Sequence, residues 1–177
     1  MKNIIAISIF GIFLSCSNRL NKLQLNSLFS DNMVIQRNTL ANIWGKGIPN
    51  KEIKIIADWG EKVILKCNSD SSWNGQLKTP KEGGPYSIVI VSELERVKIN
   101  NVMIGEVWLA SGQSNMEMPL KGYPNEPILN SESEISDSNY PDIRMFTVDK
   151  TISTKPLGTL NGGWVQTSPE SVINFSA

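Results

Sequence analysis

Alternating apolar and polar residues run through the chain from Leu25 to about Met103. Apolar side chains stand at every second position in residues 52–57 and again in 61–67, and two apolar runs of strand length follow at 85–92 and 96–104. A period of two places alternate side chains on one face of a β-strand. Turn-forming residues separate these runs at 45–51, 58–62, 68–75 and 81–87. Short strands separated by regular turns predict a small antiparallel β-sandwich over residues 25–103.

The pattern changes after residue 104. An apolar stretch that predicts a short strand, Val107 to Ala110, runs directly into a cluster of small and amide residues at 111–115. A polar segment of loop character follows at 121–140, with a helical turn predicted around "SESEIS". Residues 142–148 predict a second strand.

The closing residues predict a turn, an exposed or edge Trp164, and the start of a helix at Ser168-Pro169-Glu170. A parallel α/β domain needs several strand-helix-strand units of roughly 30 residues each. Two strands and no complete crossover helix are too few for such a domain. We therefore interpret residues 104–177 as the start of a domain that a longer protein would complete.

The amino-acid composition argues against several classes of function. The 177 residues hold 17 basic and 17 acidic side chains, and they show neither a basic stripe nor a nucleic-acid-reading motif, so nucleic acid is not an expected partner. The chain contains no histidine. Ser-His catalysis needs an imidazole, and zinc sites usually draw on histidine or several cysteines. No metal or cofactor is therefore expected, and this chain alone supplies no imidazole base.

The first 16 residues resemble an export signal. Lys2 precedes an apolar run from Ile4 to Leu14, and Ser15 stands before Cys16. At 11 residues, the run is too short to span a bilayer as a stable helix. The order Phe-Leu-Ser-Cys resembles a bacterial lipobox, which would make Cys16 the lipidated first mature residue. The alternative is ordinary secretion with cleavage near Ser15. Both predict an exported protein, and lipidation predicts a periplasmic, outer-membrane or cell-surface lipoprotein held by its lipid anchor.

The cluster "SGQSN" admits two interpretations. Gly, Ser and Asn are common turn residues, so the cluster can simply be a loop. Alternatively, Ser114 is a nucleophile at the end of a strand, with Gly112 leaving room for a substrate and a following helix aiming backbone N–H groups at a developing oxyanion. The nucleophile elbow G-x-S-x-G is not present, because Asn115-Met116 follows the serine. The spacing alone leaves both interpretations open.

A family resemblance adds to this pattern. "GEVWLASGQSNMEMPL" resembles the nucleophile block of the sialate O-acetylesterase family, a group of SGNH (GDSL-like) hydrolases that remove acetyl esters from sugars. Four further segments resemble the family in the same order: "LFSDNMVIQR", "IWGKGIP", "GGPYSIVI" and "GGWVQTSPESVINFSA". The resemblance therefore covers about Leu25 to Ala177.

The resemblance implies a fold and a role for Ser114. It implies a β-rich N-terminal portion followed by a three-layer α/β/α hydrolase domain, of which residues 104–177 would be the incomplete start. Ser114 matches the catalytic serine, and its backbone N–H matches the first oxyanion donor. The family's later oxyanion donors and its Asp-x-x-His pair would lie beyond Ala177. The expected substrate is an O-acetylated sugar or glycan, the fragment itself is expected to be inactive, and no cofactor is implied.

A rival interpretation from another class is a non-catalytic carbohydrate-binding or cell-surface module, in which the sandwich carries the function and the Ser114 cluster is a loop. A downstream Asp-x-x-His would favour the esterase. Neither interpretation identifies the acetylated sugar.

The neighbouring residues also have ordinary structural interpretations. Gln113 and Asn115 either hydrogen-bond the turn or contact substrate. Trp108, within an apolar stretch, is expected in the core, and Cys67 is expected to be a half-buried structural thiol. Glu106 and Glu117 bracket the cluster, and a glycosidase pair of carboxylates is the less favoured interpretation. Packing is favoured over carbohydrate stacking for three further tryptophans: Trp44, Trp59 and Trp73.

Overall fold

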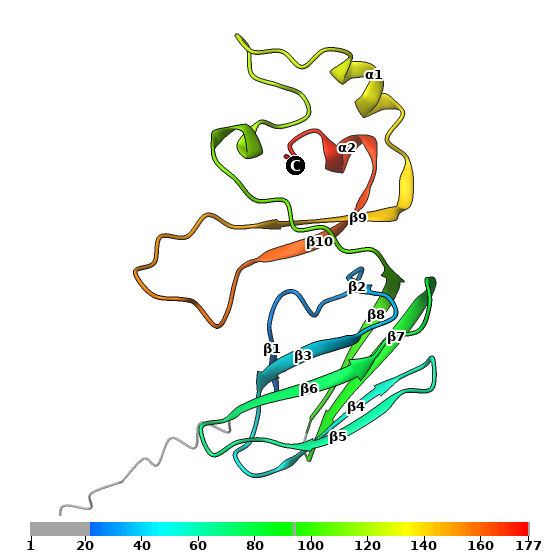
Figure 1. Ribbon diagram of the computed structural model, residues 1–177, viewed down its shortest axis with the longest axis vertical. Coiled ribbons are helices and arrows are strands. Elements are labelled where there is room, and N and C mark those ends of the chain that lie inside the picture. The colour runs from blue at the N-terminus through cyan, green and yellow to red at the C-terminus, as the bar shows by residue number, and fades with distance from the viewer. Residues whose placement is uncertain (1–21, 94, 177) are drawn as a thin grey trace, which may run out of the picture.

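The computed structural model describes residues 22–93 and 95–176, a part of the chain that is rich in β-strands and has few, short helices (Figure 1). The strands are β1 Gln24–Leu25, β2 Val34–Gln36, β3 Leu40–Lys46, β4 Glu52–Ala57, β5 Lys62–Lys66, β6 Ser72–Lys78, β7 Gly83–Ser92, β8 Glu95–Gly105, β9 Tyr140–Val148 and β10 Gly162–Thr167. The helices are the 3-10 turn η1 Ser114–Glu117, α1 Ser131–Ser136 and α2 Pro169–Val172. The β-rich prediction is confirmed, whereas the export signal and Cys16 lie outside the described residues.

Strands β1 to β8 form two sheets. One has the order β2-β8-β7-β4-β5 and the other has the order β1-β3-β6. All neighbouring strands are antiparallel except β2 and β8, which run parallel with Gln36 opposite Gly105. The antiparallel prediction is therefore wrong at this pair. Residue alternation specifies which face of a strand is buried and carries no information about the direction of its neighbour.

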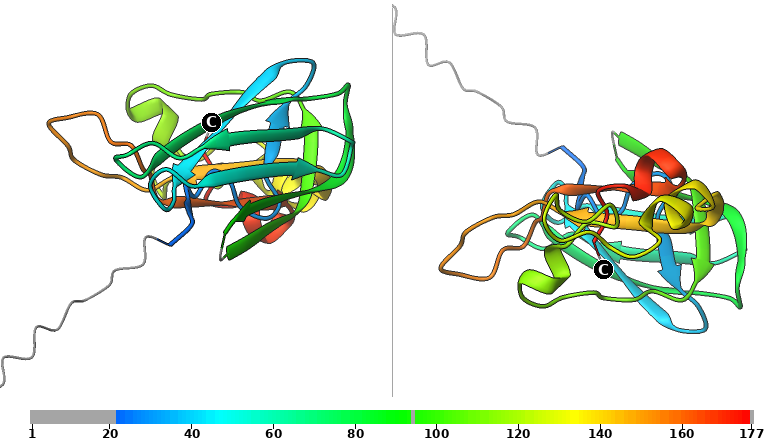
Figure 2. Two further views of the ribbon diagram at one scale, coloured as in Figure 1. Left: turned by 90° about the horizontal axis from the view of Figure 1, so that it is seen from below. Right: turned by 90° about the horizontal axis from the view of Figure 1, so that it is seen from above.

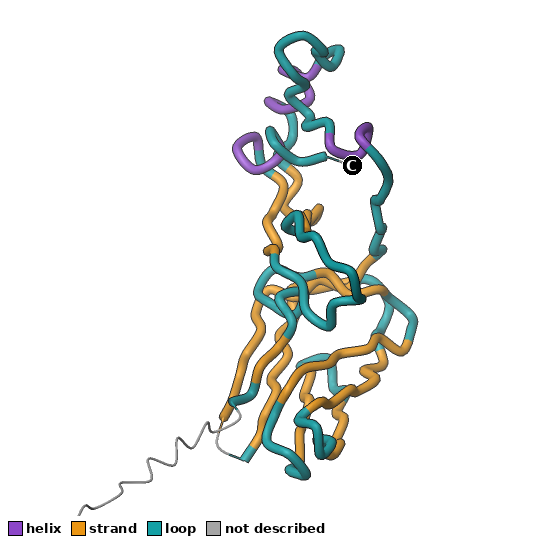
Figure 3. Tube along the Cα trace, turned by 90° about the vertical axis from the view of Figure 1, so that its left-hand side faces the viewer, coloured by secondary structure: helices purple, strands orange, loops and turns teal. Residues whose placement is uncertain are grey.

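The two sheets share one apolar core. Strand β4 buries Ile53, Ile55 and Ala57, as the period of two predicts. Gly75 of β6 shows how closely the opposing sheet approaches, because a Cβ there would lie 2.7 Å from both Ile55 Cδ1 and Leu65 Cδ2. Figure 3 shows these strands gathered at one end of the molecule. The largest fully buried side chains all belong to this core: Trp73, Met33, Ile43, Ile53, Ile55, Leu77, Ile88, Ile90, Ile99, Val102 and Cys67.

Strand β6 begins inside a segment predicted as a turn. Residues 72–75 belong to β6, and Trp73 is only 2% exposed. Cys67 is also fully buried where a half-buried position was predicted, and burial raises the pKa of its thiol. The packing prediction for the other two tryptophans is confirmed, because Trp44 meets Phe29 edge-to-face and Trp59 meets Tyr86 in the same way.

Beyond β8 the strand and helix predictions hold for three elements. The strand predicted at 142–148 is β9, the helical turn at "SESEIS" is α1, and the predicted helix start is α2. Ser168 caps α2 in a reciprocal capping box with Ser171. The Ser171 hydroxyl accepts from the Ser168 N–H, and the Ser168 hydroxyl accepts from the Ser171 N–H, which also donates to Ser168 O.

The β9–β10 hairpin lies over one end of the two sheets (Figure 2). Trp164 of β10 is half-buried, and its Nε1 donates to Leu28 O at 2.8 Å. The Arg144 guanidinium reaches from β9 to Asn32 O at 3.3 Å and to Asn101 Oδ1 at 3.3 Å. Polar contacts therefore tie the β9–β10 hairpin to Leu28 and Asn32, which precede β2, and to Asn101 of β8. Among the described residues, no helix is long and apolar enough to cross a membrane.

Candidate active site

The chain leaves β8 at Gly105 and runs to Ser114 as an exposed segment without regular structure. The strand predicted at 107–110 is absent from the described structure, so this prediction is wrong. Val107, Trp108 and Leu109 are 45%, 88% and 93% exposed, which also contradicts the core position predicted for Trp108. A strand forms only where a neighbour pairs with its backbone groups. No strand in residues 22–93 or 95–176 pairs with this segment.

Ser114 opens the 3-10 turn η1 and is exposed. Its Oγ forms no hydrogen bond with any described residue, and its backbone N–H and that of Asn115 donate to no acceptor within the same part of the chain. The turn is closed by Met116 N, which donates to Gln113 O at 2.9 Å. A hydroxyl and two neighbouring N–H groups are thus accessible from solvent at the start of one turn.

Gly112 has a packing role that the sequence pattern did not reveal. The pattern suggested that its missing side chain leaves room for a substrate. In the structure a Cβ at this position would lie 2.5 Å from Met116 Cγ, so the Met116 side chain occupies that space. Gly112 therefore lets the chain fold back closely enough to form η1.

The Gln113 and Asn115 side chains flank the serine and are exposed. Neither side chain hydrogen-bonds another described residue, so these two side chains do not hold the turn together. The turn is held by main-chain contacts instead. Both amides are accessible to a ligand at Ser114.

The two carboxylates that bracket the cluster each have a cationic partner. Glu106 Oε1 pairs with Arg37 Nε at 2.6 Å, and Glu117 Oε2 pairs with Lys150 Nζ at 2.9 Å. The hydrogen bond from Gln36, followed by that from Arg37, holds the pKa of the Glu106 carboxyl below its ordinary value. Glu106 is therefore ionised at neutral pH, and its contacts would be lost only as the pH falls through that lowered pKa.

A second contact anchors the chain after η1. Leu120 N donates to Phe175 O at 3.0 Å, and Lys121 N donates to Ile173 O at 3.2 Å. These bonds place residues 118–121 beside the end of α2, more than 50 residues later in the sequence. The Ser114 turn is thus held from both sides by residues that are distant in the sequence.

Gln36 and Arg37 are the residues of this region that the sequence analysis missed. Both lie at the end of β2, and both contact the first residues after β8. Arg37 also pairs with Glu82 at 2.8 Å. Their one signal in the sequence is that "LFSDNMVIQR" is among the segments carrying the family resemblance.

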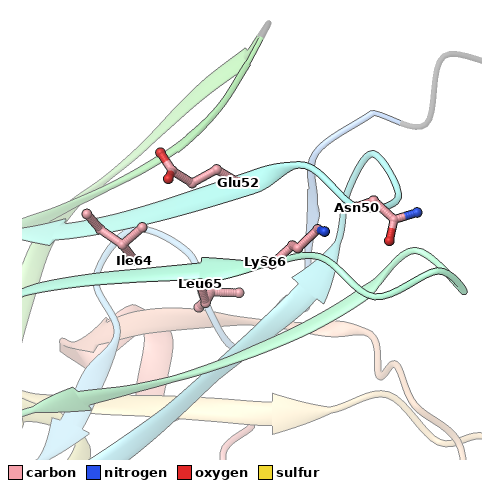
Figure 4. A pocket seen from close by; sticks show the side chains of 5 residues that line it. All are labelled: Asn50, Glu52, Ile64, Leu65 and Lys66. Atoms are coloured by element: carbon pink, nitrogen blue, oxygen red, sulfur yellow. The ribbon is translucent and has the colours of Figure 1, made fainter.

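Ser114 lines neither of two open depressions on the described part of the chain. One, of about 340 Å³, lies at the free edge of the five-stranded sheet and is lined by Asn50, Glu52, Ile64, Leu65 and Lys66 (Figure 4). The other, of about 210 Å³, is mainly apolar and includes Val107 and Trp164. Residues 22–93 and 95–176 contain no group of three or more side chains placed to hold a metal ion.

Comparisons with known proteins give a consistent result. The chain is 31% identical over 147 residues to sialate O-acetylesterase of Rattus norvegicus, a match that covers 77% of this chain. It is 29% identical over 168 residues to sialate O-acetylesterase of Mus musculus, covering 86%. The crystal structure of a carbohydrate acetylesterase from Xanthomonas citri matches with a TM-score of 0.80 and 29% identity over 88% of this chain. No protein-family model matches the chain.

The matched part of each relative is small. The chain spans 26% of the rat protein, 30% of the mouse protein and 35% of the Xanthomonas citri chain. The similarity thus extends through most of this chain and through about a third or less of the relatives.

Proposed function

Because the chain belongs to the sialate O-acetylesterase family, we propose that it is the N-terminal part of a carbohydrate O-acetylesterase with Ser114 as its nucleophile. The observation that carries the reaction class is the similarity to named acetylesterases over most of the chain. The accessible Ser114 hydroxyl beside two unpaired N–H groups supports the choice of residue. The substrate is an O-acetylated sugar or glycan.

The reaction follows from the chemistry of an activated serine. Ser114 Oγ attacks the acetyl carbonyl carbon and gives up its proton to a base, and the Ser114 N–H stabilises the negative charge that develops on the carbonyl oxygen. Collapse of this intermediate expels the sugar oxygen, which takes a proton, and leaves an acetyl-serine. Water then attacks the acetyl-serine and releases acetate. No metal or cofactor is needed for these steps.

The base is not among these residues. Ser-His hydrolases use an imidazole within hydrogen-bonding distance of the serine, and the 177 residues contain no histidine. We therefore expect the chain by itself to be inactive and the base to be supplied by a longer protein. Gln113 and Asn115 are assigned to substrate contact, because both side chains are exposed beside Ser114 and unbonded within the described residues.

The finer fold assignment belongs to the same proposal. Residues 25–103 would be a β-sandwich domain, and residues 104–177 the start of an SGNH-type, three-layer α/β/α domain. The exposed apolar stretch at 107–109 supports this assignment, because three consecutive large apolar side chains at 45% to 93% exposure are typical of a surface that another part of a protein covers.

Labelling of the full-length protein tests the assignment of Ser114. A serine-directed organophosphonate is expected to form one covalent adduct, and peptide mapping should place it on residues 113–117. Inclusion of an O-acetylated sugar should slow the labelling, because the probe and substrate compete for the same hydroxyl. An adduct on a different serine would contradict the assignment.

Export is proposed from the first 16 residues, which resemble a lipobox signal. Metabolic labelling with palmitate is expected to mark the wild-type protein in a bacterial host, and Cys16→Ser is expected to remove the label entirely, because the lipid is attached through that thiol. Equal labelling of the two proteins would contradict lipidation, and secretion of an unlabelled wild type would favour cleavage near Ser15.

A further inference from the structure

The segment that carries Ser114 starts where a parallel ladder ends. Strands β2 and β8 pair through three residues, and the last pair is Gln36 opposite Gly105. Arg37 N then donates to Gly105 O at 2.9 Å. Beyond this point the main chains separate, so main-chain bonds between β2 and the departing segment stop at Gly105.

The side chains of Gln36, the last residue of β2, and of Arg37, the next residue, continue the contact as far as Val107. Gln36 Oε1 accepts from Val107 N at 2.8 Å, and Gln36 Nε2 donates to Glu106 Oε2 at 2.7 Å. Arg37 Nε donates to the other oxygen of Glu106 at 2.6 Å. The carboxylate is therefore held at both oxygens, and one amide side chain bonds both the side chain and the main chain of the departing segment.

We propose that Gln36, Arg37 and Glu106 form a clasp that positions Ser114 by setting the direction in which the chain leaves β8. The proposal rests on the proposed function, in which Ser114 is the nucleophile. Among the described residues, no strand pairs with the chain between Val107 and the turn at Ser114. Its course therefore depends on how its ends are held, by the clasp at one end and by the bonds of Leu120 and Lys121 at the other.

A positioning role differs from a stabilising role in what it changes. The Arg37 and Glu106 side chains are 39% and 50% exposed, and exposed ion pairs contribute little to the free energy of unfolding. Catalysis is far more sensitive, because a displacement of about 1 Å at a reacting group can cost on the order of a hundredfold in rate. Loss of the clasp should therefore lower kcat and leave the free energy of unfolding nearly unchanged.

The first test is Gln36→Glu in the full-length protein. The new carboxylate faces Glu106 and repels it, although an oxygen remains to accept from Val107 N. We expect kcat for p-nitrophenyl acetate to fall by about ten- to a hundredfold with little change in KM. The double variant Gln36→Glu with Glu106→Gln should recover most of the lost rate, since an amide again donates to a carboxylate across the same gap.

Two further variants test the hydrogen bonds of the clasp and the effect of folding. Glu106→Gln keeps the shape and removes the negative charge, and its amide nitrogen then faces one of the two donors, Gln36 Nε2 or Arg37 Nε, so one hydrogen bond is lost and kcat should fall in this variant too. The matched control is Lys51→Gln, which breaks an ion pair of similar exposure with Glu93, away from the Ser114 segment, and should keep the wild-type kcat. Urea unfolding of each variant reports whether stability has changed.

The outcomes distinguish the clasp from the function. If Ser114→Ala is inactive and both Gln36→Glu and Glu106→Gln retain the wild-type kcat, the clasp is wrong and the function stands. If Ser114→Ala is fully active, the proposed function is wrong and the clasp falls with it. The clasp would also be overturned if kcat fell together with the free energy of unfolding and the double variant did not restore kcat.

Discussion

Replacing Ser114 by alanine in the full-length protein is expected to lower kcat for p-nitrophenyl acetate by roughly a million-fold, to near the background rate. The reason is that, in the proposed mechanism, the acyl-enzyme forms on the Ser114 oxygen, which alanine lacks. Steady-state hydrolysis of p-nitrophenyl acetate and release of acetate from an O-acetylated sugar are the measurements. Both should fall together.

Two controls give this expectation its specificity. Ser111→Ala changes an exposed hydroxyl three residues away in the same cluster and should leave both rates unchanged. The 177-residue chain should hydrolyse the ester no faster than its own Ser114→Ala form, because it holds no imidazole. A full-length Ser114→Ala protein with the wild-type rate would mean that the cluster is only a turn and that Ser114 is not the nucleophile.

The second large effect is expected in the core between the two sheets. Ile55 of β4 is fully buried and faces Gly75 of the opposing sheet. Ile55→Ala should lower the free energy of unfolding by about 2–5 kcal/mol, through lost apolar burial and the cavity left behind. Such a loss is a large share of the stability of a typical domain, which is about 5–15 kcal/mol.

Ile64→Ala is the matched control for that variant. Ile64 lies on the neighbouring strand β5 opposite Lys54, but its side chain points outward and is 53% exposed. The same truncation should change the free energy of unfolding by only about 0.5 kcal/mol. Urea denaturation followed by circular dichroism measures both variants. Equal losses at the two positions would contradict the burial seen in the structure.

Local sequence patterns were reliable where the cause is local. The alternation in residues 52–57 predicted which side chains of β4 are buried, and the start of α2 followed from a serine cap and a proline at the first helical position. These features depend on neighbours within a few residues, so the pattern alone was enough. The predicted nucleophile stays a prediction.

The prediction of a strand at 107–110 failed for the opposite reason. An apolar run indicates only that the segment favours burial, whereas a strand requires a partner, and no described strand provides one. Trp108 is exposed for the same reason. The pattern also could not predict that β2 and β8 run parallel, because side chains alternate in the same way in parallel and antiparallel strands.

The sequence by itself determined the β-rich character of the first hundred residues, the inward face of β4, the start of α2 and the resemblance that singles out Ser114. Only the tertiary structure decided how the Ser114 segment is held. The clasp joins residues about 70 positions apart, and the bonds beyond η1 join residues more than 50 apart. Contacts at such separations depend on how strands pair and how sheets pack. The alternation of apolar and polar residues within one strand predicts neither of these.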